Sequence, residues 1–103
     1  MSKKILELVV FELLAGVDEA SFLANAEAVS EWARAQSGFI SRDLSRSEDG
    51  GRWIEVVWWE TPEDAQRAAR LAESSEECAP MFAQIDVSRA TMIHGVPALS
   101  HAA

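Results

Sequence analysis

Hydrophobic residues gather in four short runs along the chain, each bounded by glycine, proline or a polar turn. The runs are rich in valine, isoleucine, leucine and aromatic residues, the composition that favours β-strands. They span Lys3 to Leu13, Phe39 to Arg46, Arg52 to Glu60, and Ile85 to His94. We expect each run to form one strand.

Two intervening segments have the spacing of amphipathic helices. In the first, Asp18 is a good N-cap, the helix runs to about Ser37, and Gly38 is placed as its C-cap glycine. Its apolar positions recur at helical intervals: Phe22, Leu23, Ala26, Val29 and Ala33. The second begins at Thr61 as N-cap, with proline and two acids in the first turn, and runs to about Glu73. Pro80 limits the next helical segment to a short turn.

The predicted order of elements is β-α-β-β-α-β, which defines the fold class. Asp49-Gly50 between the second and third strands is a strong hairpin signal. Both helical connections should cross over right-handed and therefore lie on the same face of the sheet. The sequence thus predicts a ferredoxin-like α+β domain with a four-stranded antiparallel sheet.

The second face of this sheet is also apolar, and the helices leave it uncovered. In the third strand, Ile54, Val56 and Trp58 point to this face, opposite to Trp53, Val57 and Trp59, because side chains alternate along a strand. A soluble monomer rarely exposes so large an apolar patch. We expect a second copy of the sheet to cover it, giving a homodimer whose interface includes Trp58.

Length and charge narrow the range of functions. The 103 residues allow one domain, taken as residues 1–97, followed by a frayed tail, 98–103. With a net charge of −8, the chain lacks the basic face that binding to nucleic acid or an anionic membrane requires. The longest apolar stretch is interrupted by Glu7 and Glu12 and is too short to span a membrane. The single cysteine, Cys78, excludes an internal disulfide, so we expect a cytoplasmic protein.

A small constellation of polar residues falls on the helix-facing side of the sheet. If the hairpin is tight, the even-numbered residues of the second strand, including Ile40, Arg42 and Leu44, share a face with Glu55 and Trp59. Arg42 and Glu55 would then meet on an apolar surface. Two interpretations stay open: a polar anchor inside a ligand pocket, or an ion pair near the sheet edge.

Other candidates are weaker. Trp59 is interpreted either as core or as the wall of a pocket, and His94 either as an acid–base group or as an exposed hydrogen-bonding residue. Cys78 is expected to be a small buried apolar side chain. A reactive thiol would need a lowered pKa, and the neighbouring acids Glu76 and Glu77 would raise it. The candidate ligand-binding residues beside this constellation are Val57, Leu44, Phe82 and Cys78. One cysteine and two histidines, with no ligand cluster, predict no bound metal, flavin or haem.

Two segments carry a family resemblance: GFISRDLSR and GRWIEVVWWETPEDAQRAA. They resemble the antibiotic biosynthesis monooxygenase-like (ABM-like) domains of the dimeric α+β barrel superfamily. There, a Gly-Phe pair opens the second strand, as Gly38-Phe39 does here. A third-strand tryptophan, here Trp59, precedes a short acidic helix start at Glu60 to Ala65. The resemblance extends from Leu6 to His94 and implies a barrel formed by two copies.

The resemblance implies two classes of function. One is a cofactor-independent monooxygenase, in which Trp59, Arg42 and Glu55 orient an aromatic or polycyclic substrate and His94 shuttles a proton. The other is a non-catalytic dimer that binds a small apolar ligand or is structural. Haem degradation is not expected: that branch needs a first-strand asparagine and a histidine near the position of Cys78. An enclosed apolar cavity with two or more convergent polar groups would favour the enzyme.

Overall fold

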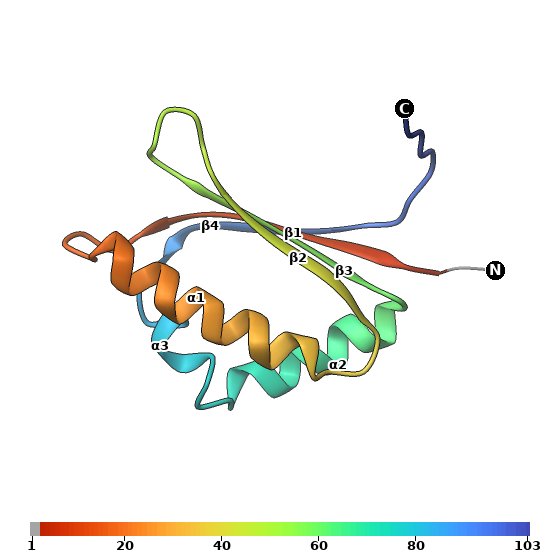
Figure 1. The fold of residues 1–103 in the computed structure, drawn as a ribbon, viewed down its shortest axis with the longest axis horizontal. Coiled ribbons are helices and arrows are strands. Elements are labelled where there is room, and N and C mark those ends of the chain that lie inside the picture. The colour runs from red at the N-terminus through yellow and green to blue at the C-terminus, as the bar shows by residue number, and fades with distance from the viewer. Residues whose placement is uncertain (1–2) are drawn as a thin grey trace.

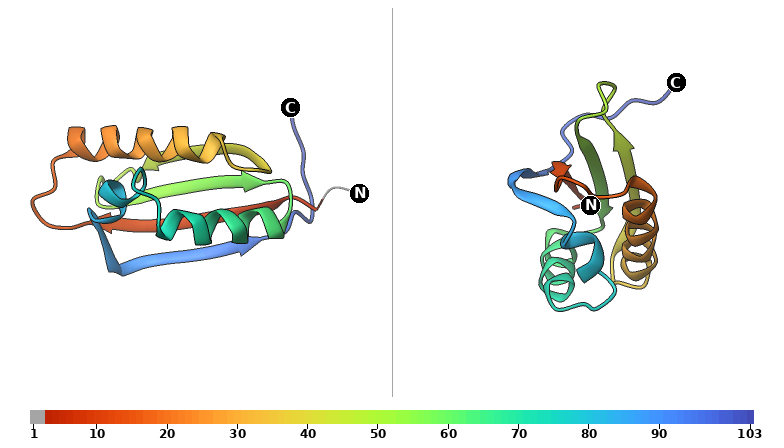
Figure 2. Two further views of the ribbon diagram at one scale, coloured as in Figure 1. Left: turned by 90° about the horizontal axis from the view of Figure 1, so that it is seen from below. Right: turned by 90° about the vertical axis from the view of Figure 1, so that its left-hand side faces the viewer.

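The computed structural model describes residues 3–103, and within them the predicted order of elements is confirmed. Its elements are β1 (Ile5–Leu13), α1 (Glu19–Arg34), β2 (Phe39–Arg46), β3 (Trp53–Trp59), α2 (Pro62–Glu73), α3 (Ala79–Phe82) and β4 (Ile85–Gly95). The strands form one antiparallel sheet in the order β2-β3-β1-β4. All three helices cover the same face of this sheet (Figures 1 and 2).

The helix starts follow their capping residues. Oδ2 of Asp18 accepts a 2.9 Å hydrogen bond from the Ser21 backbone N–H, and α1 begins at the next residue, Glu19. At α2, the Thr61 hydroxyl oxygen accepts from the backbone N–H of Asp64 at 3.0 Å. Each side-chain oxygen satisfies a backbone donor that the helix itself leaves free, and so fixes where the helix begins.

The end of α1 differs from the prediction. The helix stops at Arg34 with Ala35 as C-cap, so Gly38 is not its C-cap glycine. Gly38 instead leads into β2 with a φ of +83°. A Cβ at this position would collide with the Asp64 side chain at the start of α2. Glycine is required here by backbone conformation and by the close approach of α2.

A β-bulge places Ile40 of β2 on the face opposite to the one predicted. From Arg46 to Ser41 the β2–β3 pairing is regular, with Arg42 opposite Val57 and Leu44 opposite Glu55. The register then shifts, and Phe39 pairs with Trp59. Phe39 therefore takes the inward position and packs edge-to-face on Trp59, with ring centroids 5.7 Å apart, while Ile40 is 44% exposed. The extra residue of a bulge reverses the alternation beyond it.

Two apolar clusters join the sheet to its helices. One contains Phe11, Phe22, Ala26, Val29, Trp53, Cys78 and Met81, and the other contains Ile5, Val57, Trp59, Ala65 and Ala68. Trp32 of α1 packs against both. The opposite side of the sheet, called here the open face, carries Leu6, Leu8, Val10, Ile54, Val56 and Trp58, and no described element covers it (Figure 2). The described segment thus has one finished core and one unpartnered apolar surface.

Candidate functional site

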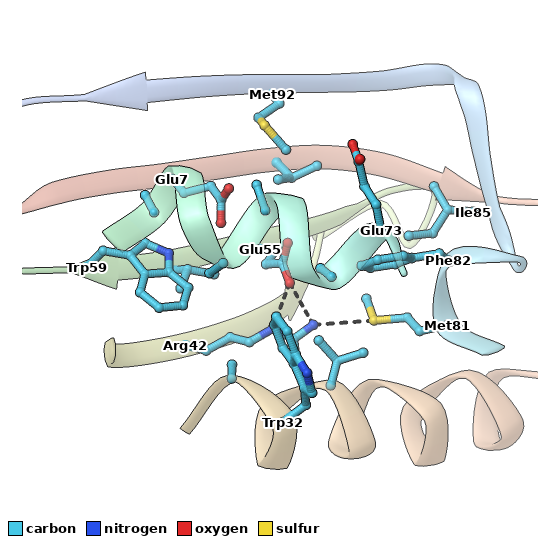
Figure 3. A pocket seen from close by; sticks show the side chains of 18 of the residues that line it. Glu7, Trp32, Arg42, Glu55, Trp59, Glu73, Met81, Phe82, Ile85 and Met92 are labelled. Atoms are coloured by element: carbon cyan, nitrogen blue, oxygen red, sulfur yellow. Dashed lines mark hydrogen bonds and ion pairs between the residues drawn. The ribbon is translucent and has the colours of Figure 1, made fainter. Parts of the chain in front are cut away.

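A cavity of about 290 Å³ lies between the sheet and the helices. The sheet supplies its floor, α1 and α2 form its sides, and α3 contributes residues at one end, beside Ile85 of β4 (Figure 3). Most lining side chains are apolar, among them Val9, Phe11, Val29, Trp32, Val57, Ala68, Ala72, Met81, Phe82, Ile85 and Met92. The polar side chains that line it are Glu7, Arg42, Glu55, Trp59 at its indole nitrogen, and Glu73. An apolar cavity with a few convergent polar groups is the usual form of a small-molecule site.

All three guanidinium nitrogens of Arg42 contact other groups of the protein. Its Nε donates to Oε2 of Glu55 at 2.7 Å, and Nη2 lies 2.6 Å from the same oxygen. Nη1 donates to the Ala26 carbonyl at 2.8 Å and to the Ser30 hydroxyl oxygen at 2.7 Å. Nη2 also lies 3.4 Å from the sulfur of Met81. With its side chain only 4% exposed, this guanidinium is placed to hold Glu55 and α1 rather than to receive a ligand.

Glu55 is consequently fixed as an anion beside the cavity. Arg42 takes one of its carboxylate oxygens, and the other points away from the guanidinium (Figure 3). The carboxylate is 16% exposed, and an enclosed charge of this kind is tolerated only with a partner. The arrangement combines both interpretations left open by the sequence, since Arg42 and Glu55 form an ion pair and both line the cavity.

Glu7 is a further carboxyl at the cavity, and it is not among the candidates that the sequence pattern singled out. It lies near the middle of β1, with its side chain 14% exposed. Burial raises its pKa above the ordinary 4.5, and the negative charge of Glu55 raises it further. His94 and the indole N–H of Trp59 oppose this rise by stabilising the charged form. The available signal was a carboxylate at a position of β1 whose alternation points inward, between the apolar Ile5 and Val9.

His94 lies outside the cavity lining but contacts it through Glu7. The two residues are paired across β1 and β4, and Nε2 of His94 is 3.5 Å from Oε2 of Glu7. The histidine side chain is 43% exposed, so it faces solvent on its other side. β4 is an edge strand, which explains how one strand position can reach both the cavity and water.

Trp59 serves as core and as cavity wall together. It is 3% exposed, and its ring packs on Phe39 and the alanines of α2. Its Nε1 has no hydrogen-bond partner among the described residues, although it points toward Glu7 (Figure 3). The N–H is near enough to lower the Glu7 pKa but does not form a well-shaped hydrogen bond. An unpartnered buried donor beside a cavity is a ready contact for a ligand oxygen.

The other candidate ligand-binding residues divide into two pairs. Val57 and Phe82 line the cavity. Leu44 and Cys78 are not among its lining residues, and both pack in the cluster around Phe11 and Phe22. Cys78 is fully buried, and burial raises the pKa of its thiol, which leaves it without the thiolate character of a reactive cysteine.

The described residues, 3–103, contain no group of three or more histidine, cysteine, aspartate or glutamate side chains that could hold a metal ion. Within the same range, no helix has both the length and the apolar character needed to cross a membrane.

Comparison with known proteins gives a result for the fold but none for the sequence. No family profile matches the chain, and no curated protein matches it. Solved structures do match, over nearly the full length of both chains. They include a variant of SnoaB, a cofactor-independent oxygenase from Streptomyces nogalater, with 16% identity, a TM-score of 0.73, and coverage of 98% of this chain and 97% of that one.

Two other solved structures share this fold over nearly the whole chain. A candidate antibiotic biosynthesis monooxygenase from Bordetella bronchiseptica has 22% identity and a TM-score of 0.77, covering 94% of this chain and 99% of that chain. The ActVA-Orf6 monooxygenase of Streptomyces coelicolor, solved with the ligand nanaomycin D, has 20% identity and a TM-score of 0.65, with coverage of 98% and 93%. The chain is therefore an α+β protein of the ferredoxin-like class with a cavity under its sheet. More narrowly, it has the fold of the antibiotic biosynthesis monooxygenases.

Proposed function

We propose that this protein binds an aromatic small molecule in the cavity and oxygenates it without a bound cofactor. The observation that carries the proposal is the cavity itself: an apolar space in which the carboxyl groups of Glu7 and Glu55, both from the sheet, converge with an unpartnered indole N–H. Its volume of about 290 Å³ lies near the lower limit of small-molecule pockets, which suits a ligand of a few fused rings. The similarity to SnoaB and ActVA-Orf6 supports the same class of reaction.

The chemistry of such a reaction sets what the site must supply. Without a cofactor, the substrate itself provides all the electrons for O₂. A ring CH₂ group, for example, becomes a ketone with one oxygen atom, and its two hydrogens leave with the other atom as water. The substrate must first lose a proton to become electron-rich, so a proton acceptor has to lie beside it. The apolar walls of this cavity lower the local dielectric and so strengthen the charge interactions beside them.

Trp59 and Glu55 have distinct parts in this scheme. The Trp59 N–H, having no protein partner among the described residues, is positioned to donate to a substrate oxygen and to stabilise the negative charge that develops there. Glu55, fixed by Arg42, presents a carboxylate at the cavity. That charge disfavours carboxylate and phosphate ligands and favours neutral ones.

Oxygen uptake with anthrone as the probe tests the proposal. Purified protein without added cofactor should consume O₂ and form anthraquinone in equal amounts. Ala72→Phe, which fills the cavity from α2, should abolish this, whereas Ala28→Phe on the exposed side of α1 should not. Binding of anthrone with no oxygen uptake above the rate in buffer would instead identify a non-catalytic ligand-binding protein.

We further propose that the protein is a homodimer joined through its open face. Six apolar side chains of β1 and β3 lie there without any described element over them. Two copies packed sheet to sheet would remove them from water, at about 25 cal/mol for each Å² buried. The mass of the protein in solution tests this proposal.

A further inference from the structure

Three ionisable side chains, from three neighbouring strands, lie close together at or beside the cavity: Glu7, His94 and Glu55. Glu7 of β1 is paired directly with His94 of β4 on one side and with Val57 of β3 on the other. Glu55 is two residues from Val57 along β3 and on the same face, which places it diagonally from Glu7. Diagonal side chains in an antiparallel sheet are about 7–8 Å apart, near enough for their charges to interact without a hydrogen bond.

The two carboxyl groups have different environments. Glu55 has a cationic partner, Arg42, in contact at 2.6 Å. Glu7 has no arginine or lysine partner in the described residues. The basic side chain beside it is His94, with Nε2 3.5 Å from Oε2 of Glu7. Two carboxyls in one cavity with opposed environments commonly divide into a fixed charge and a proton carrier.

We propose that Glu7 is the group that accepts the proton lost by the ligand, and that His94 passes this proton to solvent. The proposal rests on the proposed function, in which the ligand must lose a proton. The path would run from Glu7 on β1 to the neighbouring edge strand, β4, along the helix-facing side of the sheet. It would reach solvent at His94 without any movement of the helices.

Each proton transfer balances. The ligand O–H or C–H bond breaks, its electron pair stays on the ligand, and an O–H bond forms on the Glu7 carboxylate. Glu7 then gives the proton to Nε2 of neutral His94, the imidazolium releases its Nδ1 proton to water, and exchange with water returns the ring to the Nδ1–H tautomer. The separation of 3.5 Å between Oε2 and Nε2 is slightly beyond a normal hydrogen bond, and a small side-chain rotation closes it.

The charges around Glu7 suit a carboxylate that accepts a proton more readily than an exposed one. Burial and the charge of Glu55 raise the pKa of Glu7, and His94 lowers it. The other ionisable groups at the cavity are Arg42 from β2, already paired with Glu55, and Glu73 from α2. α1 contributes only apolar side chains to the lining: Val29, Trp32 and Ala33. A carboxyl with a raised pKa is a better proton acceptor than an ordinary one once it is ionised.

Carbon NMR titration of the side-chain carboxyls tests the coupling without any ligand. Glu7 should titrate at higher pH than the exposed glutamates. His94→Asn should move its midpoint upward, since a stabilising positive charge is lost, and Glu55→Gln should move it downward, since a repelling negative charge is lost. His101→Asn in the tail and Glu31→Gln on α1 should leave it unchanged. A Glu7 midpoint that ignores the His94→Asn substitution would overturn the proposed path.

Fluorescence of bound 2-naphthol tests the transfer itself, because this probe emits as naphtholate when an acceptor takes its proton. The wild-type protein should show naphtholate emission, and Glu7→Gln should reduce it by about tenfold, a modest loss for one acid–base group. Full naphtholate emission in Glu7→Gln, or none in the wild type, would overturn the role of Glu7.

The two proposals can fail separately. Naphtholate emission that depends on Glu7, combined with no oxidation of anthrone, would leave the proton path standing and refute the oxygenase. Normal anthrone oxidation by Glu7→Gln would refute the proton path alone.

Discussion

Arg42 of β2 and Glu55 of β3 form the most enclosed ion pair within residues 3–103, with Nη2 of the arginine 2.6 Å from Oε2 of the glutamate. The same arginine holds the Ala26 carbonyl and the Ser30 hydroxyl of α1. One side chain therefore fixes a carboxylate at the cavity and joins the sheet to the helix that covers it.

Arg42→Met should destabilise the protein by about 3 kcal/mol, because it leaves the Glu55 charge enclosed and unpaired. The free energy of unfolding, measured with urea, gives the comparison. Arg34→Met is the matched control: Arg34 pairs with Glu31 on the surface, with both side chains more than 60% exposed. Its loss should cost less than about 1 kcal/mol. Equal losses for the two variants would contradict the structural role assigned to Arg42.

Trp59→Phe should weaken ligand binding and also lower stability, because it removes part of a side chain that is only 3% exposed. The substitution keeps an aromatic ring against Phe39 and removes an N–H that has no partner among the described residues. A hydrogen bond to the ligand contributes about 1 kcal/mol, so the Kd for 2-naphthol should rise about fivefold. Trp53→Phe is the control, since Trp53 packs on Phe22 and does not line the cavity. Unchanged affinity in Trp59→Phe would remove the indole N–H from the binding site.

Glu7→Gln should stabilise the protein at neutral pH. The pKa of Glu7 is higher in the folded protein than its ordinary 4.5, so folding favours the protonated form. Its contribution to stability is fully present below pH 4.5 and is lost as the pH rises through the raised folded value. Glutamine does not ionise and avoids this loss. The gain over the wild type should therefore shrink as the pH falls toward the ordinary value, and urea unfolding across that pH range measures it. A gain independent of pH would argue against an enclosed, titrating Glu7.

Trp58→Glu should prevent self-association. Trp58 lies on the open face, and a charge there would be buried without a partner in a sheet-to-sheet dimer. Sedimentation should give a dimer for the wild type, with an interface above about 1,200 Å² in total, and a monomer or insoluble protein for the variant. Leu71→Glu on α2, an exposed apolar residue on the helical side, is the control. A wild-type protein that stays monomeric at micromolar concentration would refute the dimer.

The sequence also predicts that the protein carries no metal, flavin or haem, and a titration with haemin checks part of this. The haem-degrading proteins of the family that the sequence resembles need an asparagine in the first strand and a histidine late in the second helix. This chain has Glu7 in the first strand and the buried Cys78 near the place of that histidine. We therefore expect no defined Soret spectrum at one equivalent of haemin. A stoichiometric complex with sharp bands would contradict this prediction.

The elements and their order could be predicted from local sequence signals. Asp18 and Thr61 start the two main helices by capping free backbone N–H groups, an interaction that spans only three residues of chain. The alternation along β3 is equally local and places Glu55 and Trp59 on one face. The hairpin parity then places Arg42 beside Glu55, because pairing in β2 and β3 is regular over that part of the register.

The remaining features emerge only in the packed molecule, because they depend on contacts between distant segments. The bulge that turns Phe39 inward is set by packing against Trp59, and Gly38 is needed because Asp64 approaches it from α2. Glu7 gains its raised pKa from burial under helices and from a charge on the neighbouring strand. The partners of a side chain across a sheet follow from register and helix placement, and these are settled only when the whole chain packs.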